Sequence, residues 1–543
     1  MKKDRLKLLS FLAFFALTLS LFSAAEGATL TSGNFKYTVE NGNAAITGYV
    51  SAPTGQLTFP AMLDGHPVTS IGSGAFQDCA GLTGITLPAG LTSIGNYAFF
   101  DCTALNSVSL PAGVKSIGKS AFAGCVSLTS IRIPDGVTVI EDYTFSGCSA
   151  LKSVTLPAGV TAIGKDAFSS CSALTSISLP NSVDYIGNYA FQNCSALTSI
   201  RIPEKVSAIG FSMFSGCTRL SSVSLPTGLT RIGDYVFMDC AALKKIDIPS
   251  GLTFIGSYAF AGCTSLESFR IPSGVTSIGG YTFSRCTALS NISIPDSVTH
   301  IGEYAFGSCP ALKSVDLPSS VQIISRRAFE GCSALTAVRI PAGITAIENR
   351  TFKNCSALSK VEIQSAPHYI GDSAFENCKA LRSIVIPEGT GGIYGSAFKG
   401  SGLTSVHIPS SITTIGEGAF DGKVLLSVET GSYAHQWAIE KGQPFETVGG
   451  VLSLSDVTAK YTDREVGQPN RYYATAQGGT APYTYYFRLY KGGAVYHNSG
   501  WITADNYRID FTEAGTYTMT VKVQDANGNK TDWVSCGETT VAK

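Results

Sequence analysis

Cysteine is the residue whose spacing first suggests chemistry in this chain. Fourteen of the fifteen cysteines follow one another at intervals of 23 residues, in a series that runs from Cys79 to Cys378. Cysteines at a fixed interval could form disulfides, hold a metal or pack as buried thiols. A disulfide and a metal site both require side chains that converge, so the elements that position the cysteines decide which chemistry is open to them.

The interval is the length of a repeating unit, of which residues 171–193, CSALTSISLPNSVDYIGNYAFQN, are one copy. In each unit an Ile-x-Ile-Pro segment predicts a short strand with one buried face, and its proline ends the strand because it lacks an N–H. An Ile-Gly pair and an Ala-Phe pair complete the unit. A unit this short cannot bury its own apolar side. We therefore predict a solenoid of about 16 stacked coils over residues 64–426.

The pattern Cys-x-x-Leu-x-x-Ile-x-Ile-Pro-x-x-Val-x-x-Ile-Gly-x-x-Ala-Phe resembles the BspA-like leucine-rich repeat. This resemblance implies a curved solenoid with a parallel sheet on its concave face. It also implies a place among secreted and surface proteins of host-associated microbes, some of which act as adhesins. Gln364 replaces an expected proline and Ser401 an expected cysteine. The array is therefore expected to become less regular toward its C-terminal end.

The way the coils stack decides whether the cysteines form disulfides, hold a metal or pack as buried thiols. Neighbouring parallel strands lie ~4.8 Å apart, within the Cα range of a disulfide, but stacked side chains point in parallel and a bridge needs them to converge. The column also lies beside leucine and phenylalanine, where a thiol behaves as a small apolar group. No Cys-x-x-Cys pair or histidine accompanies the series. We expect reduced, buried thiols, no metal and no cofactor.

The segments outside the array indicate export, end caps and a second domain. Residues 1–25 carry four basic residues, an apolar run and a small-residue end, which are typical of a signal peptide. Residues 26–63 contain a hairpin pattern and are predicted to cap the first coil. Residues 427–449 contain a short helical segment that resembles a closing helix. Residues 450–543 lose the repeat period, and their segments APYTYYF and AGTYTMTVKVQDANGN resemble a bacterial Ig-like or PKD-like β-sandwich.

Composition and motifs argue against several classes of function. Lysine plus arginine equals aspartate plus glutamate at 39 each, so no basic excess points to nucleic acid. Beyond the predicted signal peptide no segment is long and apolar enough to span a membrane. The six histidines share no spacing, and no nucleophile elbow or phosphate loop is evident. We predict no catalytic residues and a protein that is not an enzyme.

The outward position of the predicted strand is where a ligand would make contact. Arginine occupies this position in every third coil, and duplication of a three-coil block is enough to explain the spacing. Charge supports a functional interpretation. Arg270 and Arg339 have acidic residues in adjacent coils that can neutralise them, whereas the two earlier arginines have only hydroxyl neighbours. The predicted ligand-binding residues are Arg132, Arg201, Ser109, Thr155, Ser178 and Ser224.

Tyrosine forms a second column, two residues before the buried phenylalanine. The column could be an exposed stripe for protein or sugar contact, or it could pack between coils at their edge, which we favour. Its members are Tyr97, Tyr143, Tyr189, Tyr235, Tyr258, Tyr281 and Tyr304.

Together these features predict a secreted or cell-surface, adhesin-like protein that recognises an extracellular or host-surface protein or glycan through its extended solenoid face. The first alternative is a non-adhesive envelope scaffold or spacer, and the next is a carbohydrate-processing enzyme. The adhesin role comes from the family resemblance, because a fold by itself does not imply a function.

Overall fold

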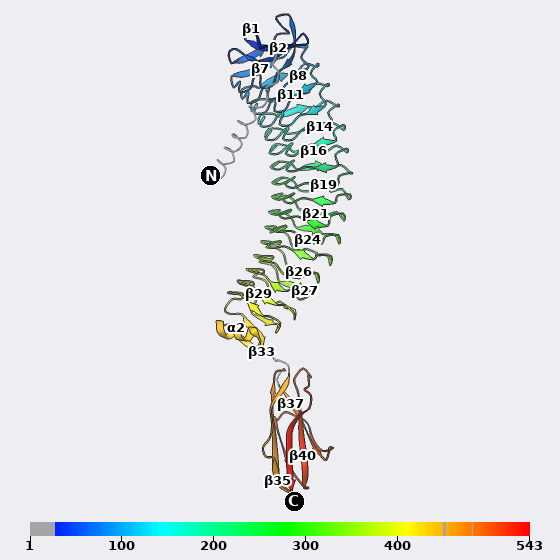
Figure 1. Ribbon diagram of the computed structural model, residues 1–543, viewed down its shortest axis with the longest axis vertical. Helices are drawn as coiled ribbons and strands as arrows, with labels where there is room; N and C mark the ends of the chain where they lie inside the picture. Colours follow the sequence, from blue (N-terminus) through cyan, green and yellow to red (C-terminus); the bar gives the residue numbers. More distant parts are fainter. Residues whose placement is uncertain (1–27, 449–451, 480–481) are drawn as a thin grey trace. The chain divides into compact units, whose positions relative to one another are not determined.

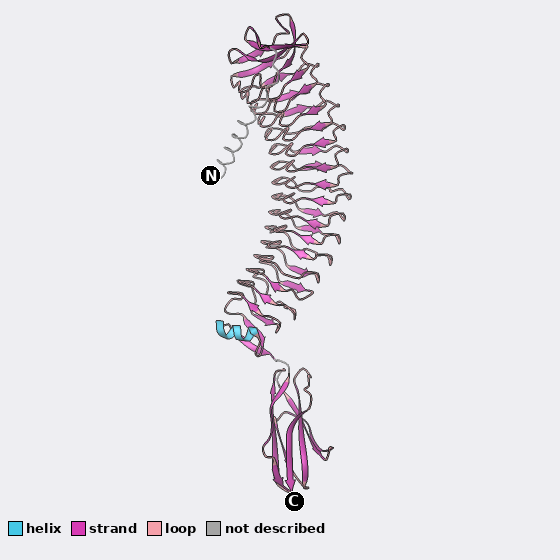
Figure 2. Cartoon of the chain, viewed as in Figure 1, coloured by secondary structure: helices cyan, strands magenta, loops and turns pink. Residues whose placement is uncertain are grey.

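The computed structural model describes residues 28–448, 452–479 and 482–543, so the predicted signal peptide lies outside the described residues. The described chain consists of short strands and turns with one helix (Figures 1 and 2). It divides into two compact units. The first holds residues up to Val321 together with Ala328–Ser333, and the second holds Gln322–Arg327 together with Ala334–Lys543.

A hairpin closes the N-terminal end of the first unit. Strand β2 (Phe35–Glu40) pairs antiparallel with β3 (Asn43–Tyr49), and β1 (Leu30–Ser32) pairs with β2. Asn41 and Gly42 between β2 and β3 have positive φ, 48° and 78°, which suits a tight hairpin turn. Strand β3 pairs parallel with β6 (His66–Ile71), so the hairpin covers the first coil.

Each coil of the first unit contributes up to two short strands, and these pair in parallel with a strand of an adjacent coil, with equivalent residues of the repeat paired (Figure 1). First strands carry the apolar-x-apolar segment of the repeat: β4 (Gly55–Thr58), β7 (Leu82–Thr86), β9 (Ser107–Ser109), β11 (Ser130–Arg132), β13 (Ser153–Thr155), β16 (Ser199–Arg201), β18 (Ser222–Ser224), β21 (Ser268–Arg270) and β23 (Asn291–Ser293). Second strands carry the isoleucine column: β6, β8 (Ser93–Ile94), β10 (Ser116–Ile117), β12 (Val139–Ile140), β14 (Ala162–Ile163), β15 (Tyr185–Ile186), β17 (Ala208–Ile209), β19 (Arg231–Ile232), β20 (Phe254–Ile255), β22 (Ser277–Ile278) and β24 (His300–Ile301). The predicted β-solenoid is confirmed.

The second unit continues the same architecture. Its parallel strands are β26 (Ala337–Ile340), β27 (Lys360–Ile363), β28 (Tyr369–Ile370), β29 (Gly392–Ile393), β30 (Ser405–Ile408), β31 (Thr414–Ile415), β32 (Leu425–Glu429) and β33 (Phe445–Val448). Gly392 pairs with Thr414, one position before the partner that the regular repeat would give it, so this coil is shorter than the others. Helix α2 (Tyr433–Lys441) is capped by Ser432, whose Oγ accepts a hydrogen bond from the backbone N of His435 at 3.2 Å.

The last part of the second unit is an all-β domain of two sheets. Strands β34 (Ser453–Ala459), β36 (Pro469–Gln477) and β39 (Asn506–Asp510) form one sheet. The other contains β35 (Asp463–Glu465), β41 (Val534–Ala542), β40 (Gly515–Gln524), β37 (Thr484–Lys491) and β38 (Ala494–Ile502). Side chains from both sheets, such as Tyr472 and Phe487, form one buried core. The domain is therefore a β-sandwich.

Columns of identical side chains fill the solenoid core. From Phe76 to Phe329 the rings stack between successive coils with centroids 5.2–5.8 Å apart. The fourteen cysteines of the column are buried and form no disulfide with one another, as the parallel geometry predicts, and Cys536 is buried in the β-sandwich. The thiols of the column are also donors. Cys217 Sγ, for example, donates to the carbonyl of Phe191 at 3.2 Å, and this cross-coil bond recurs along the column.

Candidate ligand-binding face

The six predicted ligand-binding residues lie on one face of the first unit. We call it the strand face and define it by the outward residue between the two apolar positions of each first-strand segment. All six side chains are exposed, because alternation along a strand turns this position away from the core. Five lie in strands, and Ser178 lies in a coil that has no first strand: Ser109 in β9, Arg132 in β11, Thr155 in β13, Arg201 in β16 and Ser224 in β18.

The first strands of this region pair two coils at a time, and this pairing follows the three-coil period of the arginines. Strand β11 pairs with β13, β16 with β18 and β21 with β23, whereas residues 176–178 and 245–247 between these pairs form no strand. Each arginine coil therefore pairs with the coil that follows it. The residue opposite the arginine carries a hydroxyl in all three pairs: Thr155 opposite Arg132, Ser224 opposite Arg201 and Ser293 opposite Arg270.

The expected neutralisation of Arg270 by Asp247 is not found. Asp247 instead pairs with Lys245, whose Nζ lies 2.8 Å from its Oδ1. The reason is local: residues 245–247 form no ladder with β21, so no register holds Asp247 opposite the arginine, while Lys245 lies two residues away on the same side. No described ion pair or side-chain hydrogen bond includes Arg132, Arg201 or Arg270.

Arg339 behaves as predicted. Strands β26 and β27 form a ladder that sets Arg339 opposite Glu362, and Arg339 Nε lies 3.2 Å from Glu362 Oε1. The arginine at this position of the three-coil block is thus neutralised in one coil, at Arg339, and has no described carboxylate partner in three others. The difference follows from the residue that the ladder sets opposite, a carboxylate or a hydroxyl.

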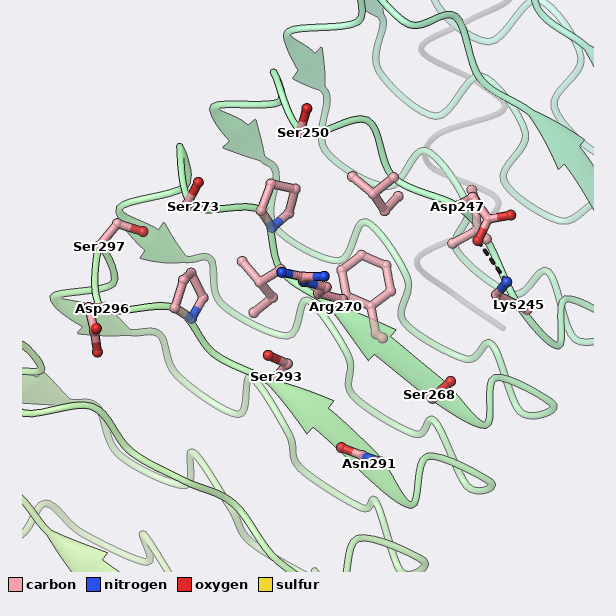
Figure 3. Close-up of a pocket in the computed structure, with 16 residues that line it drawn as sticks. Lys245, Asp247, Ser250, Ser268, Arg270, Ser273, Asn291, Ser293, Asp296 and Ser297 are labelled. Carbon is pink, nitrogen blue, oxygen red and sulfur yellow. Dashed lines mark ion pairs between the residues drawn. The ribbon is translucent and has the colours of Figure 1, made fainter.

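A groove of about 790 Å³ surrounds Arg270 on the strand face (Figure 3). Three consecutive coils line it. Figure 3 shows Arg270 between serines of the turns that follow the strand segments, such as Ser250 and Ser273, and polar strand residues, such as Ser268 and Asn291. Sequence reasoning missed this groove, because its lining comes from three successive coils and no local residue pattern marks it.

The four charged side chains that line the groove sum to zero, but Arg270 is in no described ion pair and can bind one anionic group. Lys245 and Asp247 neutralise each other, which leaves Arg270 as a cation with no described carboxylate partner. Asp296 is the second carboxylate among the lining residues. A guanidinium can bind a carboxylate through two parallel N–H bonds, and the surrounding hydroxyls can donate to or accept from neutral groups. The volume lies in the usual range of small-ligand pockets.

The tyrosine column packs between coils, as the favoured interpretation predicts. Tyr258 stacks on Tyr235 and on Tyr281, with ring centroids 4.7 and 4.5 Å apart, and all three rings are half-buried. Each has positive φ, between 57° and 61°. Rings stacked in this way cover one another's faces. Their edges and hydroxyls remain at the surface, which is a poor platform for stacking a sugar ring.

The thiols are positioned for packing and not for reactivity. Burial raises the pKa of Cys125 and of Cys217 to about 12, so neither is a thiolate at neutral pH.

Within residues 28–448, 452–479 and 482–543, no group of three or more His, Cys, Asp or Glu side chains is placed to hold a metal ion. No helix in these same ranges is long and apolar enough to cross a membrane.

Short parallel strands that recur at the period of the repeat, around buried leucine, isoleucine and phenylalanine columns, define a leucine-rich-repeat solenoid. A model of the BspA type leucine rich repeat region, with six copies, matches residues 69–198, 185–313 and 299–426. The chain belongs to the BspA-type leucine-rich repeat family. None of the curated proteins matches it.

Solved structures of bacterial repeat proteins resemble this chain. A leucine-rich repeat protein from Bacteroides ovatus is 28% identical over 77% of this chain and 99% of its own, with a TM-score of 0.55. A leucine rich cell surface protein from Faecalibacterium prausnitzii is 29% identical over 63% of this chain and 96% of its own, with a TM-score of 0.41. The T. pallidum leucine rich repeat protein is 30% identical over 43% of this chain and all of its own, with a TM-score of 0.32. Family and fold are those of bacterial leucine-rich repeat proteins.

Proposed function

We propose that this chain is a secreted or cell-surface, adhesin-like protein that binds an acidic group of a protein or glycan through the strand face of its first unit. One observation carries the proposal. Three exposed arginines occupy equivalent positions, each faces a hydroxyl residue, and none has a carboxylate partner among the described residues: Arg132, Arg201 and Arg270. An exposed guanidinium that is not neutralised attracts anions and binds carboxylates bidentately.

Recognition on such a face relies on repetition. The strand face offers serine, threonine, arginine and aspartate at its outward positions, and none of these described positions in the first unit holds the tryptophan or tyrosine anchors that dominate most binding hot spots. Each arginine therefore contributes weakly. Equivalent arginines are three coils apart, roughly 14 Å at the usual strand spacing, so an extended ligand can engage more than one and gain affinity by effective concentration.

Export is the second part of the proposal. It is supported by the basic, apolar and small-residue pattern of residues 1–25. It is also supported by membership of the family, whose resemblance implies secreted and surface proteins. Antibody binding to the solenoid on intact cells tests this part independently of any ligand.

The binding test compares two sets of arginine variants. The chain from residue 26 onward is screened against matrix proteins, receptor ectodomains and glycans at low and high salt. The triple variant Arg132→Ala, Arg201→Ala, Arg270→Ala is expected to weaken any hit by about tenfold or more, because charge-assisted bonds are lost. The matched control is Arg339→Ala, which removes an arginine that Glu362 already neutralises and should leave affinity unchanged. Binding should also weaken at high salt.

Two outcomes contradict the proposal. Unchanged binding by the triple variant to every ligand found would remove the strand face as the site. Failure of the screen together with a solenoid that antibodies cannot reach on intact cells would favour the envelope scaffold. Thermal melts of each variant exclude unfolding as the cause of a loss.

A further inference from the structure

The C-terminal β-sandwich carries a basic pocket. The pocket has a volume of about 280 Å³, and its lining includes four cationic side chains and no acidic one: Lys460, Arg464, Arg471 and Arg508. The cations come from three separate segments of sequence, so the fold brings them together. Their concentration in so small a volume is electrostatically unfavourable without an anion.

The strand register shows which of these cations lie close enough to repel each other. Strands β36 and β39 are antiparallel, and their register sets Arg471 directly opposite Arg508. Like charges directly opposite each other across a ladder are destabilising. On the other side of β36, the backbone N of Lys460 donates to the carbonyl of Arg471 at 2.8 Å. Three cationic residues therefore occupy adjacent positions across three neighbouring segments of the same sheet.

The fourth cation reaches the pocket from the other sheet. Arg464 lies in β35, and its guanidinium carbon sits 3.2 Å from the centre of the Tyr461 ring. The Nζ of Lys460 lies 5.2 Å from the centre of the same ring. The Nε of Arg464 is buried and has no hydrogen-bond acceptor among the described residues. A buried charged donor without an acceptor is costly, and an anion in the pocket would supply one.

Nearby groups neutralise this charge only in part. Arg508 Nη2 lies 3.2 Å from Oδ1 of Asp510, in an exposed pair, and Arg471 Nη1 donates to the neutral amide oxygen of Asn506 at 2.9 Å. Asp463 and Glu465 flank Arg464 in β35, but alternation along the strand directs their side chains to the opposite side. One carboxylate thus compensates four cations.

We propose that this pocket binds a phosphate group, either free or as part of a polymer. A phosphate presents several acceptor oxygens in different directions, which matches cationic donors that approach from two sheets, and its double charge offsets most of the excess of three cations. The pocket is independent of the strand face, so this site and the proposed adhesin function can succeed or fail separately. A phosphate-bearing polymer of the cell envelope held here would retain the protein at the surface.

The test measures phosphate binding by the chain from residue 26 onward. Calorimetry and thermal melts are run with inorganic phosphate and with polyphosphate, against sodium chloride at matched ionic strength. Phosphate should raise the melting temperature of the β-sandwich beyond the effect of chloride, since a ligand that binds the native state stabilises it. Polyphosphate that binds at least ~10-fold more tightly per phosphate than inorganic phosphate would identify a polymer as the ligand, and equal affinity would identify free phosphate.

Variants make the assignment specific. Arg471→Gln with Arg508→Gln should weaken phosphate binding by about tenfold or more. The same variant should melt at an equal or higher temperature without phosphate, because the opposed charges are gone. Arg464→Gln is a second variant that leaves the opposed pair intact and should also weaken binding. The control Lys522→Gln removes a cation from β40, outside the pocket, and should bind as the unmodified chain does.

The proposal is overturned if phosphate stabilises the protein no more than chloride does. It is also overturned if the double variant and Arg464→Gln both retain the affinity of Lys522→Gln. A gain in melting temperature by the double variant that accompanies unchanged binding would show that the arginines repel each other without forming a site.

Discussion

The Nε of Arg339 lies 3.2 Å from Oε1 of Glu362, which the β26–β27 ladder sets directly opposite it. One block earlier, the equivalent Arg270 faces Ser293 across the β21–β23 ladder. The two arginines share their backbone pairing, and the residue directly opposite is a serine in one ladder and a glutamate in the other. A single position in the following coil therefore decides whether an arginine of the strand face is available to a ligand.

This relationship predicts that Ser293→Glu neutralises Arg270. The new carboxylate should pair with the guanidinium as Glu362 does with Arg339, so an acidic ligand that uses Arg270 should bind as weakly as it does to Arg270→Ala. An exposed ion pair contributes only about 0–1 kcal/mol, so stability should change little. Affinity is measured by calorimetry with a ligand found in the screen.

Ser293→Gln is the matched control for that change. It has the size of glutamate without the charge, and it should retain most of the affinity. Equal weakening by Ser293→Gln and Ser293→Glu would mean that bulk and not charge blocks the ligand, and it would contradict the electrostatic explanation.

A second prediction concerns the backbone of the tyrosine column. Tyr258 has φ of 57° and stacks on a ring on each side. Tyr258→Ala should lose both stacking contacts, which contribute about 1–3 kcal/mol in total to the free energy of unfolding. It still places a non-glycine residue in the left-handed backbone conformation. Tyr258→Gly loses the same contacts but relieves a strain of about 1 kcal/mol, so it should be the more stable of the two variants. Urea unfolding measures both.

Tyr185 provides the control for the tyrosine prediction. It is exposed in β15 and is not among the residues with positive φ. Glycine there should be less stable than alanine, by about 0.5–1 kcal/mol, because glycine loses more backbone entropy on folding. The same order of stability at positions 185 and 258 would argue that the left-handed conformation of Tyr258 carries no strain.

The repeating core could be predicted from sequence because each coil meets only copies of itself. The repeat period specifies which residue stacks on which, so the phenylalanine and cysteine columns follow directly. The glycine after isoleucine follows in the same way. A Cβ on Gly187 would lie 2.5 Å from the backbone N of Lys165 in the preceding coil, so the close approach of these two coils favours glycine at this position.

The candidate sites depended on features that the period does not encode. Whether Asp247 reaches Arg270 depends on an interruption of the strand ladder, which separates two residues that are adjacent in the repeat. The basic pocket depends on register in the sandwich, where Arg471 and Arg508 are distant in sequence but directly opposite in space. Neither relationship has a local sequence pattern.

The thiol column predicts a third measurable property. Because burial raises the pKa of Cys217 to about 12, the thiolate fraction at pH 8 is about one part in 10,000, and access to the sulfur is also blocked. Iodoacetamide at pH 8 should therefore leave Cys217 unmodified in the native protein. All fifteen cysteines should react once urea unfolds the chain. Mass spectrometry of tryptic peptides reports both states. Rapid native labelling of Cys217 would show that the coils open locally.

The last prediction concerns the N-terminal cap and its dependence on pH. Tyr37 Oη donates to Oδ2 of Asp64 at 2.7 Å, and Ser32 Oγ donates to Oδ1 at 2.8 Å. These hydrogen bonds lower the pKa of Asp64, and the first of them raises the pKa of Tyr37. A carboxyl with a lowered pKa in the folded state contributes stability above its unfolded pKa, about 3.9. That contribution is lost as the pH falls through the folded value.

Asp64→Asn tests this contribution without disturbing the backbone. Asp64 has φ of 47°, a conformation that asparagine tolerates, but the amide cannot accept both hydrogen bonds as a carboxylate does. Hydrogen exchange of β2 and β3 should show faster opening in Asp64→Asn at pH 6, because the carboxylate that ties the hairpin to the turn is missing. The two proteins should converge as the pH falls below about 4 and the native Asp64 is protonated. Tyr37→Phe, which removes one donor, should show a smaller difference of the same sign. A difference between native protein and Asp64→Asn that stays constant from pH 6 to pH 3 would show that the charge of Asp64 does not stabilise the cap.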